Sequence, residues 1–183
     1  MYDKIQRWYK IDGELFLKNI GIHPGHIVLD FGCGEGNYSI PAAKVVGSVG
    51  KVYALDQNSL VLNKLMQKIS SMGLYNITIV HTLEELALSL KDDLLDIVLL
   101  YDVIHSYYFT EHERRNLLES IRNMVKPTAL ISIFPKHMEP SEIRKIGDEM
   151  SKLGFFLKRK ISLKLIHNGG LETGSILNYR KET

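Results

Sequence analysis

The chain of 183 residues has the size of one globular domain, and we expect residues 1–183 to fold as a single unit. Its 23 basic and 21 acidic residues leave a net charge of +2, so no overall field attracts nucleic acid or an anionic membrane. The single cysteine, Cys33, excludes an intramolecular disulfide, and no apolar run approaches the ~20 residues that cross a bilayer. We therefore expect a cytoplasmic protein without nucleic-acid or membrane partners.

Residues 1–20 are predicted to form an N-terminal helix with four side chains available for burial. Tyr9 and its neighbours could close over a ligand as a lid, or the helix could simply pack on the domain. The four side chains are those of Ile5, Trp8, Leu15 and Phe16.

From Ile27 onward, short apolar runs alternate with helical patterns, which is typical of a parallel α/β sheet. Ser59 is the expected N-cap of the second helix of this series, and Gly73 is placed to end it. Thr82 and Glu85 have capping-box spacing before the third helix. The expected strands are 27–30, 52–55 and 77–80, and the first and third helices are 39–46 and 83–90. The apolar stripe of the second helix contains Leu62, Leu65, Met66 and Ile69.

A fourth strand is expected over residues 97–100, and a fifth over 129–134. Between them, Thr110 and Glu113 repeat the capping-box spacing, and Pro127 is expected to stop the helix that follows. Ser141 is the expected cap of the last helix, which Gly154 closes. The buried stripes of these two helices are Leu117, Leu118, Ile121 and Val125, and Ile143, Ile146, Met150 and Leu153.

The last stretch alternates apolar and polar residues from Leu157 onward, which predicts a strand with one exposed face and antiparallel pairing. Residues 167–170 supply the turn, and residues 174–179 form the returning strand. The lysines of the polar face protect an exposed strand from edge-to-edge pairing, or they form a basic docking surface.

A glycine-rich loop leaves the first strand at Asp30 and contains Gly32, Gly34 and Gly36. Ligands of open α/β sheets bind at the carboxyl ends of the strands, and glycines let a ligand approach the backbone closely. Asp56 ends the second strand, where it can accept hydrogen bonds from ribose hydroxyls. A purely structural turn with Asp56 as a helix cap is the alternative.

The glycine spacing separates two classes of cofactor. The dinucleotide fingerprint G-x-G-x-x-G has its third glycine one position later, where this chain has Asn37. An acid such as Asp30 would also repel a pyrophosphate, whereas it suits the amino group of an aminoacyl nucleoside. The loop therefore favours an aminoacyl nucleoside over NAD.

The segment Val28-Leu29-Asp30-Phe31-Gly32-Cys33-Gly34-Glu35-Gly36 resembles motif I of class I S-adenosylmethionine-dependent methyltransferases. Residues 54–56 resemble the second motif of that family, whose acid holds the cofactor ribose. Residues 24–26, 99–105, 125–127 and 153–155 are similar to its other landmarks. The resemblance implies a Rossmann-like α/β fold with a seven-stranded, mostly parallel sheet and helices on both faces. It also implies a C-terminal antiparallel hairpin that places the last strand beside the fifth.

The resemblance implies S-adenosylmethionine as cofactor and S-adenosylhomocysteine as product. Where the family carries an acid for the adenine after strand three, this chain has Thr82-Leu83 with Glu84 just beyond. No Asn-Pro-Pro-Tyr segment follows strand four, which weighs against methylation of nucleic-acid bases. The implied cofactor-binding residues are Asp30, Gly32, Cys33, Gly34, Gly36, Asn37, Asp56, Gln57, Leu83, Glu84 and Tyr101.

Methyl transfer requires alignment of donor and acceptor, and a base only where the acceptor must first lose a proton. Tyr101, Asp102, His105 and His137 lie near strand ends, and we select His105 and Asp102 as catalytic candidates. His105 could instead be a packed histidine of the pocket wall, and Asp102 could cap a turn.

We predict no metal, because residues 134–137 carry no carboxylate or amide, and His105, His112 and Glu111 form no convincing cluster. The leading hypothesis is an enzyme that methylates a small molecule. A protein methyltransferase, a non-catalytic binding protein of the same fold and an NAD-dependent reductase are the alternatives. The sequence identifies neither the acceptor nor the oligomeric state.

Overall fold

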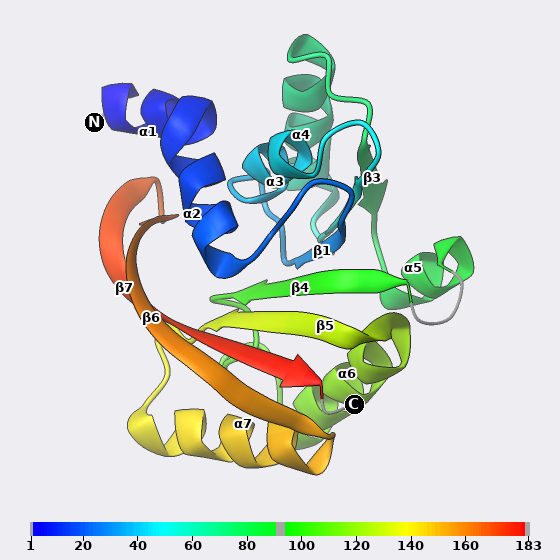
Figure 1. The fold of residues 1–183 in the computed structure, drawn as a ribbon, viewed down its shortest axis with the longest axis vertical. Helices are drawn as coiled ribbons and strands as arrows, with labels where there is room; N and C mark the ends of the chain where they lie inside the picture. The colour runs from blue at the N-terminus through cyan, green and yellow to red at the C-terminus, as the bar shows by residue number, and fades with distance from the viewer. Residues whose placement is uncertain (1, 91–93, 182–183) are drawn as a thin grey trace.

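The computed structural model describes residues 2–90 and 94–181, whose strands form one seven-stranded sheet (Figure 1). The strands are β1 (Ile27–Phe31), β2 (Lys51–Leu55), β3 (Ile77–Val80), β4 (Leu95–Tyr101), β5 (Val125–Phe134), β6 (Phe155–His167) and β7 (Gly170–Lys181). Their order across the sheet is β3-β2-β1-β4-β5-β7-β6. Strands β1 to β5 pair in parallel, and β7 runs antiparallel between β5 and β6. The predicted fold and the place of the last strand beside the fifth are confirmed.

Helices cover both faces of the sheet. One apolar cluster joins α5, α6 and α7 to one face, and two others join α2, α3 and α4 to the opposite face. The helices are α1 (Tyr2–Arg7), α2 (Gly13–Ile20), α3 (Ser39–Val46), α4 (Ser59–Ser71), α5 (Leu83–Ser89), α6 (Glu111–Met124) and α7 (Pro140–Lys152), with the π-helical turn η1 (Trp8–Asp12) between the first two.

The topology creates a crevice between β1 and β4. From β1 the chain proceeds outward through β2 and β3, and then crosses to β4 and β5 on the other side. The loops after β1 and β4 therefore diverge at the carboxyl edge of the sheet. Ligands of doubly wound sheets bind at this switch point.

Several helix boundaries differ from the sequence predictions because backbone capping is decided by local contacts. Asn58, not Ser59, caps α4, since its side chain accepts a hydrogen bond from the Leu60 N–H. Met66, expected in the buried stripe of α4, is 52% exposed. The last helix starts after Glu139 with a proline in its first turn, so Ser141 is not its cap. The expected capping box of Thr110 and Glu113 is present. Gly73 and Gly154, which follow α4 and α7, have the positive φ angles expected where those helices end.

Pro127 does not end α6 but lies inside β5, which begins at Val125. Leu95 pairs with Val125 and Ile97 pairs with Leu130, so residues 126–129 bulge out of the ladder. A bulge tolerates a proline because no ladder hydrogen bond is required from it. The strand is therefore longer than the predicted 129–134.

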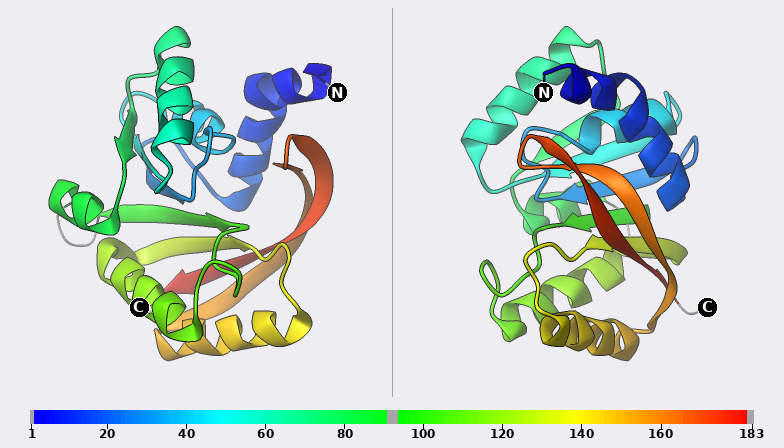
Figure 2. Two further views of the ribbon diagram at one scale, coloured as in Figure 1. Left: turned by 180° about the vertical axis from the view of Figure 1, so that it is seen from behind. Right: turned by 90° about the vertical axis from the view of Figure 1, so that its left-hand side faces the viewer.

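The β6–β7 hairpin extends well beyond the segment of β7 that pairs with β5. The two strands pair from Phe155 with Lys181 to His167 with Gly170, whereas β7 pairs with β5 only over residues 177–180. The tip curves past the end of β5 toward the N-terminal helices (Figure 2). The Tyr38 hydroxyl donates a hydrogen bond to the Ile166 carbonyl oxygen across 2.6 Å and fixes the tip there.

The N-terminal segment packs on the glycine loop through η1. The Trp8 indole N–H donates to the Asn37 carbonyl oxygen at 2.7 Å, and the indole is buried with Phe16. Leu15, expected among the buried side chains, is 52% exposed. None of the helices within residues 2–90 and 94–181 has the length and apolar character that a bilayer crossing requires.

Candidate cofactor and acceptor site

Three glycines of the loop after β1 have positive φ angles, and each meets different surroundings. An added Cβ at Gly32 would come within 2.7 Å of the Val103 Cγ2 atom, and one at Gly36 would overlap Leu65. Gly34, with φ of 52°, has no atom within 4 Å of the corresponding position. Gly32 and Gly36 therefore serve packing, whereas Gly34 leaves open space above the loop.

Asp56 holds this loop in place. Its Oδ2 atom accepts a hydrogen bond from the Gly34 N–H, and its Oδ1 atom accepts one from the Asn58 N–H, both at 2.9 Å. An ionised carboxylate offers about four acceptor positions. The two hydrogen bonds therefore leave about two acceptor positions free. Asp56 also lines the cavity beside the loop, so these positions are accessible to a bound molecule.

A cavity of about 620 Å³ opens between the loops after β1, β2 and β4. Its lining residues are Phe31, Gly32, Leu55, Asp56, Gln57, Asn58, Asp102, Val103, Tyr108, Phe109 and Glu113. A second hollow of about 380 Å³ shares Phe31, Leu55, Gln57, Phe109 and Glu113 with it and adds Leu83 and Glu84. Of the predicted cofactor residues, the structure thus brings Gly32, Asp56, Gln57, Leu83 and Glu84 to one continuous concave surface.

Asp30 lies beneath the loop and does not line the cavity. Its side chain is 2% exposed, and Oδ2 accepts a 2.5 Å hydrogen bond from the Ser39 hydroxyl. Burial raises the pKa of Asp30 to about 6, and the nearby charge of Asp56 acts in the same direction. Asp30 therefore does not present its carboxylate to the cavity, in contrast to the direct ligand contact expected from the sequence.

The raised pKa of Asp30 predicts a specific pH dependence of stability. Between the ordinary value of 3.8 and about 6, the folded chain retains a proton that the unfolded chain releases, so the free energy of unfolding falls as pH rises. Asp30→Asn should remove this fall and raise stability at pH 7, by up to about 3 kcal/mol. Urea unfolding at pH 4 and pH 7 measures it, with the exposed Asp148→Asn as control. Equal pH slopes in wild type and Asp30→Asn would contradict the assignment.

Two further predicted cofactor residues point into the core. The Tyr101 hydroxyl hydrogen-bonds the Ser132 hydroxyl at 2.9 Å, and burial raises the pKa of this phenol far above its usual range. The side chain packs with α2 and α3, so its expected place at the crevice rim is corrected. Cys33 is 5% exposed, and burial likewise raises the pKa of its thiol. Cys33 is thus a packed thiol and no nucleophile.

Asn37 is engaged by the N-terminal segment. Its Oδ1 atom accepts a 2.5 Å hydrogen bond from the Tyr9 hydroxyl, in addition to the Trp8 contact with its carbonyl oxygen. Burial raises the pKa of Tyr9 to about 12, so the phenol stays a donor. Asn37 therefore anchors the N-terminal helices to the outside of the loop, and its side chain is not turned toward the cavity.

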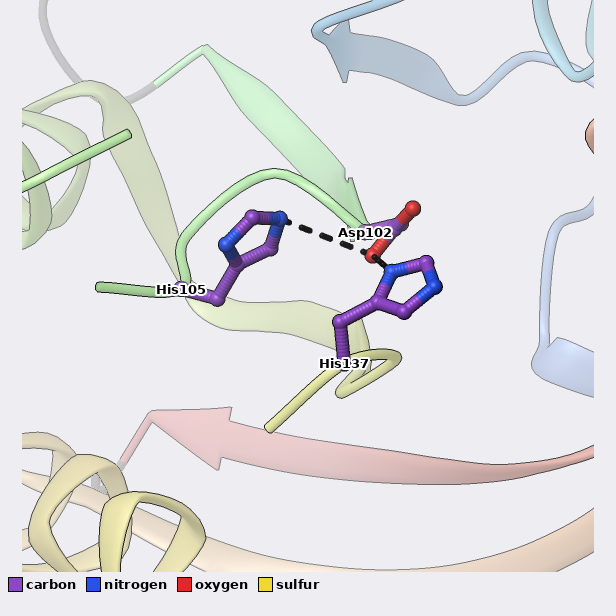
Figure 3. A group of neighbouring side chains, drawn as sticks. All are labelled: Asp102, His105 and His137. Carbon is purple, nitrogen blue, oxygen red and sulfur yellow. Dashed lines mark hydrogen bonds and ion pairs between the residues drawn. The ribbon is translucent and has the colours of Figure 1, made fainter. Parts of the chain in front are cut away.

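At the end of β4, imidazoles from three segments surround the Asp102 carboxylate. His137, after β5, places Nδ1 at 2.9 Å from Asp102 Oδ1, and His167, at the hairpin tip, places Nε2 at 2.7 Å from Asp102 Oδ2. The Nε2 atom of His105 lies 3.7 Å from Asp102 Oδ1. Figure 3 shows His105 and His137 converging on Asp102.

His105 itself is 6% exposed and is not among the residues that line the cavity. Its Nδ1 atom accepts a hydrogen bond from the Tyr107 N–H at 3.3 Å, and its Nε2 atom is directed toward Asp102. Asp102 is the member of the cluster that reaches the cavity. The expected role of His105 as a base acting alone on the acceptor is therefore not supported by its position.

The sequence of this chain matches a known protein family and several curated proteins. Residues 28–128, more than half of the chain, match the family model described as a methyltransferase domain. The chain belongs to the methyltransferase domain family.

A demethylmenaquinone methyltransferase of Geobacillus stearothermophilus is 34% identical over 65 residues, which are 36% of this chain and 28% of the relative. A probable cobalt-precorrin-6B C(15)-methyltransferase of Saccharolobus solfataricus is 34% identical over 62 residues, 34% of this chain and 31% of the relative. The chain thus matches about a third of the length of these curated relatives.

Solved methyltransferase structures superpose on nearly the whole of this chain. An S-adenosylmethionine-dependent methyltransferase from Aquifex aeolicus superposes with a TM-score of 0.71 at 26% identity, covering 96% of this chain and 97% of that one. A magnesium protoporphyrin IX methyltransferase from Synechocystis PCC 6803, solved with its cofactor bound, gives a TM-score of 0.67 at 20% identity. It covers 97% of this chain and 79% of its own. The resemblance to class I methyltransferases is confirmed.

The cavity and the Asp102 cluster contain residues that the sequence did not single out. Phe31, Val103, Tyr108 and Phe109 line the cavity, and His167 joins the Asp102 cluster from the far end of the chain. Sequence signals existed for Phe31, which lies in the glycine-loop motif, and for the loop after β4, whose position at the carboxyl edge follows from the alternation of strands and helices. His167 carried none, because the predicted hairpin did not fix how far its tip reaches.

Proposed function

We propose that this chain binds S-adenosylmethionine across the glycine loop and transfers its methyl group to a small-molecule acceptor. The observation that carries the proposal is the open position above Gly34, which lies beside the Asp56 carboxylate at the switch point of the sheet. The Cβ positions of Gly32 and Gly36 are filled by neighbouring side chains, whereas Gly34 has open space there, and the backbone of Gly32 lines the adjoining cavity.

The residues around the cavity fit the three parts of this cofactor. The remaining acceptor positions of Asp56 suit ribose hydroxyls, and Gln57 lies beside it. The second hollow, with Leu83 and Glu84, suits a planar base with an amino group, because it combines an apolar wall with a carboxylate. The buried Asp30 carboxylate under the loop favours a positively charged amino-acid moiety over a pyrophosphate.

When bound, S-adenosylmethionine supplies a methyl group on a sulfonium sulfur, and S-adenosylhomocysteine is the product. This chain orients the acceptor and excludes water through the loop after β4, which covers the cavity with Val103, Tyr108 and Phe109. Asp102 provides the polar wall of the same cavity. The names of the relatives, demethylmenaquinone and cobalt-precorrin methyltransferases, support a small-molecule acceptor over a protein.

The proposal is tested by ligand-induced thermal stabilisation. S-adenosylhomocysteine should raise the melting temperature, whereas NADH should not, because the third glycine of the dinucleotide fingerprint is absent. Asp56→Ala should weaken S-adenosylhomocysteine binding, since charge-assisted hydrogen bonds are worth roughly 1.5–3 kcal/mol each. Tighter binding of NADH would contradict the proposal. Binding without S-adenosylhomocysteine formation from any acceptor in a screen would favour a non-catalytic role.

A further inference from the structure

The Asp102 cluster is assembled from three distant parts of the chain at one edge of the acceptor side. The ligand atoms offered by Asp102, His105 and His137 all lie within 4.8 Å of one another. One imidazole follows β4 by four residues, and the other follows β5 by three. His137 is hydrogen-bonded to Asp102 at 2.9 Å, whereas the distance of 3.7 Å from His105 Nε2 to Asp102 Oδ1 exceeds that of a hydrogen bond, so hydrogen bonding does not account for the approach of His105.

These separations match the ligand shell of a small divalent cation. Metal–nitrogen and metal–oxygen bonds of about 2.0–2.2 Å place neighbouring ligand atoms about 3.0–3.5 Å apart. The distances of 2.9 Å from Asp102 Oδ1 to His137 Nδ1 and 3.7 Å to His105 Nε2 bracket that range. We propose that Asp102, His105 and His137 bind a divalent first-row transition metal of the zinc or iron class. Two imidazoles and one carboxylate on one side of an ion are a known donor set for such metals, and they leave positions open.

The surroundings of the proposed site support its preorganisation. Asp102 (φ 55°), His137 (φ 59°) and Asn168 (φ 46°) are the non-glycine residues with positive φ among residues 2–90 and 94–181. Two of them are proposed ligands, and the third, Asn168, belongs to the Asn-Gly turn between β6 and β7, where this conformation is ordinary. Left-handed backbone costs about 1–2 kcal/mol per residue, and such strain gathers at ligand clamps.

His167 has the position of an outer partner that orients the carboxylate. Its Nε2 atom lies 2.7 Å from Asp102 Oδ2, the oxygen opposite to the one that faces His105 and His137. Its Nδ1 atom lies 3.7 Å from Glu172 Oε2, and Lys136 pairs with the other Glu172 oxygen at 2.8 Å. Ligating carboxylates are held by such partners in most metal sites. The Lys136 charge is balanced by Glu172, so it does not oppose a cation at Asp102.

Metal binding requires one rearrangement of the existing contacts. The Tyr107 N–H donates to His105 Nδ1, which places the proton of a neutral imidazole on Nε2. Ligation through Nε2 requires the other tautomer, in which the proton has moved to Nδ1, and a protonated Nδ1 can no longer accept the Tyr107 hydrogen bond. This contact is long at 3.3 Å, and it lies in a turn whose Tyr107 side chain is 83% exposed, so its loss costs little. This proposal differs from the sequence-based expectation of a site without a metal.

The proposed ion indicates the acceptor class, and this step rests on the proposed function. Asp102 lines the cavity, so the open positions of the ion are on the acceptor side. A hydroxyl or thiol group bound to a divalent cation releases its proton to solvent near neutral pH. The acceptor class is therefore a small molecule with an ionisable hydroxyl or thiol group.

The test uses Co²⁺ alone as the probe, with the full chain stripped of metal by chelation. Wild type should bind one Co²⁺ per chain with visible d–d absorption bands, and Zn²⁺ should displace it. Asp102→Asn, which keeps the left-handed backbone accessible, and His137→Ala should weaken Co²⁺ binding by more than about 100-fold. His167→Gln should weaken it by about 10-fold or more, because an outer partner is lost. His112→Ala, an exposed histidine of α6, is the matched control and should bind like wild type.

Binding of S-adenosylhomocysteine to the metal-free chain is measured in parallel. His137 is a surface residue, 53% exposed, so His137→Ala should retain its fold and its affinity for S-adenosylhomocysteine. Absence of stoichiometric Co²⁺ binding, or binding that survives in both Asp102→Asn and His137→Ala, overturns the metal site alone. Co²⁺ binding without S-adenosylhomocysteine binding overturns the proposed function and leaves the metal site standing.

Discussion

Replacing Gly34 with valine is expected to weaken S-adenosylhomocysteine binding by at least about 100-fold, or about 2.7 kcal/mol. Gly34 has no atom within 4 Å of an added Cβ, so a branched side chain would fit the apo protein and fill the space of the cofactor. Its φ of 52° also makes a valine costly, by about 1–2 kcal/mol of stability. Isothermal titration of wild type and variant measures the loss of affinity.

Gly73 provides the matched control for that substitution. It has φ of 64°, and it too has no atom within 4 Å of an added Cβ, but it follows α4 away from the cavity. Gly73→Val should lose a similar amount of stability and keep full affinity for S-adenosylhomocysteine. If both valine variants bind equally well, the space above Gly34 is not the cofactor site.

Replacing Arg114 with methionine is expected to destabilise the fold by about 3–5 kcal/mol. The Arg114 guanidinium, on α6, is 1% exposed and forms two 2.9 Å hydrogen bonds with the Glu149 carboxylate of α7. The mutation would leave that buried carboxylate without its partner. Arg114 also lies 3.6 Å from Glu142, whose Oε1 accepts a hydrogen bond from the Ser106 N–H. The loop that carries Asp102 and His105 should therefore loosen as well.

Urea unfolding of two companion variants separates the ion pair from a general effect of losing a charge. Arg115→Met changes the neighbouring exposed arginine and should leave stability within about 0.5 kcal/mol of wild type. The double variant Arg114→Met/Glu149→Leu should recover most of the lost stability, because the buried Glu149 carboxylate is removed with its partner and Glu142 keeps its hydrogen bond from the Ser106 N–H. A double variant as unstable as Arg114→Met would show that packing volume, not charge pairing, dominates at this position.

The sequence signals for the cofactor half of the proposed site are local, and five of the eleven residues expected there lie on its concave surface. The glycine loop and Asp56 lie within residues 30–56, and the adjoining strands follow from short apolar runs. Side-chain direction was harder to predict: Tyr101 shares the face of Ile97 and Leu99, but the alternation does not say which face meets the crevice. The three glycines likewise look equivalent in the sequence, although only at Gly34 is the position of an added Cβ free of neighbouring atoms.

The acceptor half could not be predicted because its residues meet only in three dimensions. His137 and His167 are 35 and 65 residues from Asp102 along the chain, and no spacing rule joins them. The start of β5 was missed for a related reason, since the bulge at residues 126–129 depends on its pairing with β4. Asn58 replaced Ser59 as a cap because both residues are good caps and the backbone geometry chose between them.

The overhang of the β6–β7 hairpin makes the two halves of the proposed site structurally independent. The residues proposed to bind the cofactor come from the loops after β1, β2 and β3, whereas the tip reaches the site from the opposite end of the sheet. Side chains of a strand alternate with a period of two, so lengthening each arm by two residues keeps every side chain on its face and extends the tip by about 7 Å. Lengthening by one residue would turn His167 to the opposite face. Hairpin length in steps of two is thus a way to resize the acceptor space while the cofactor loop stays unchanged.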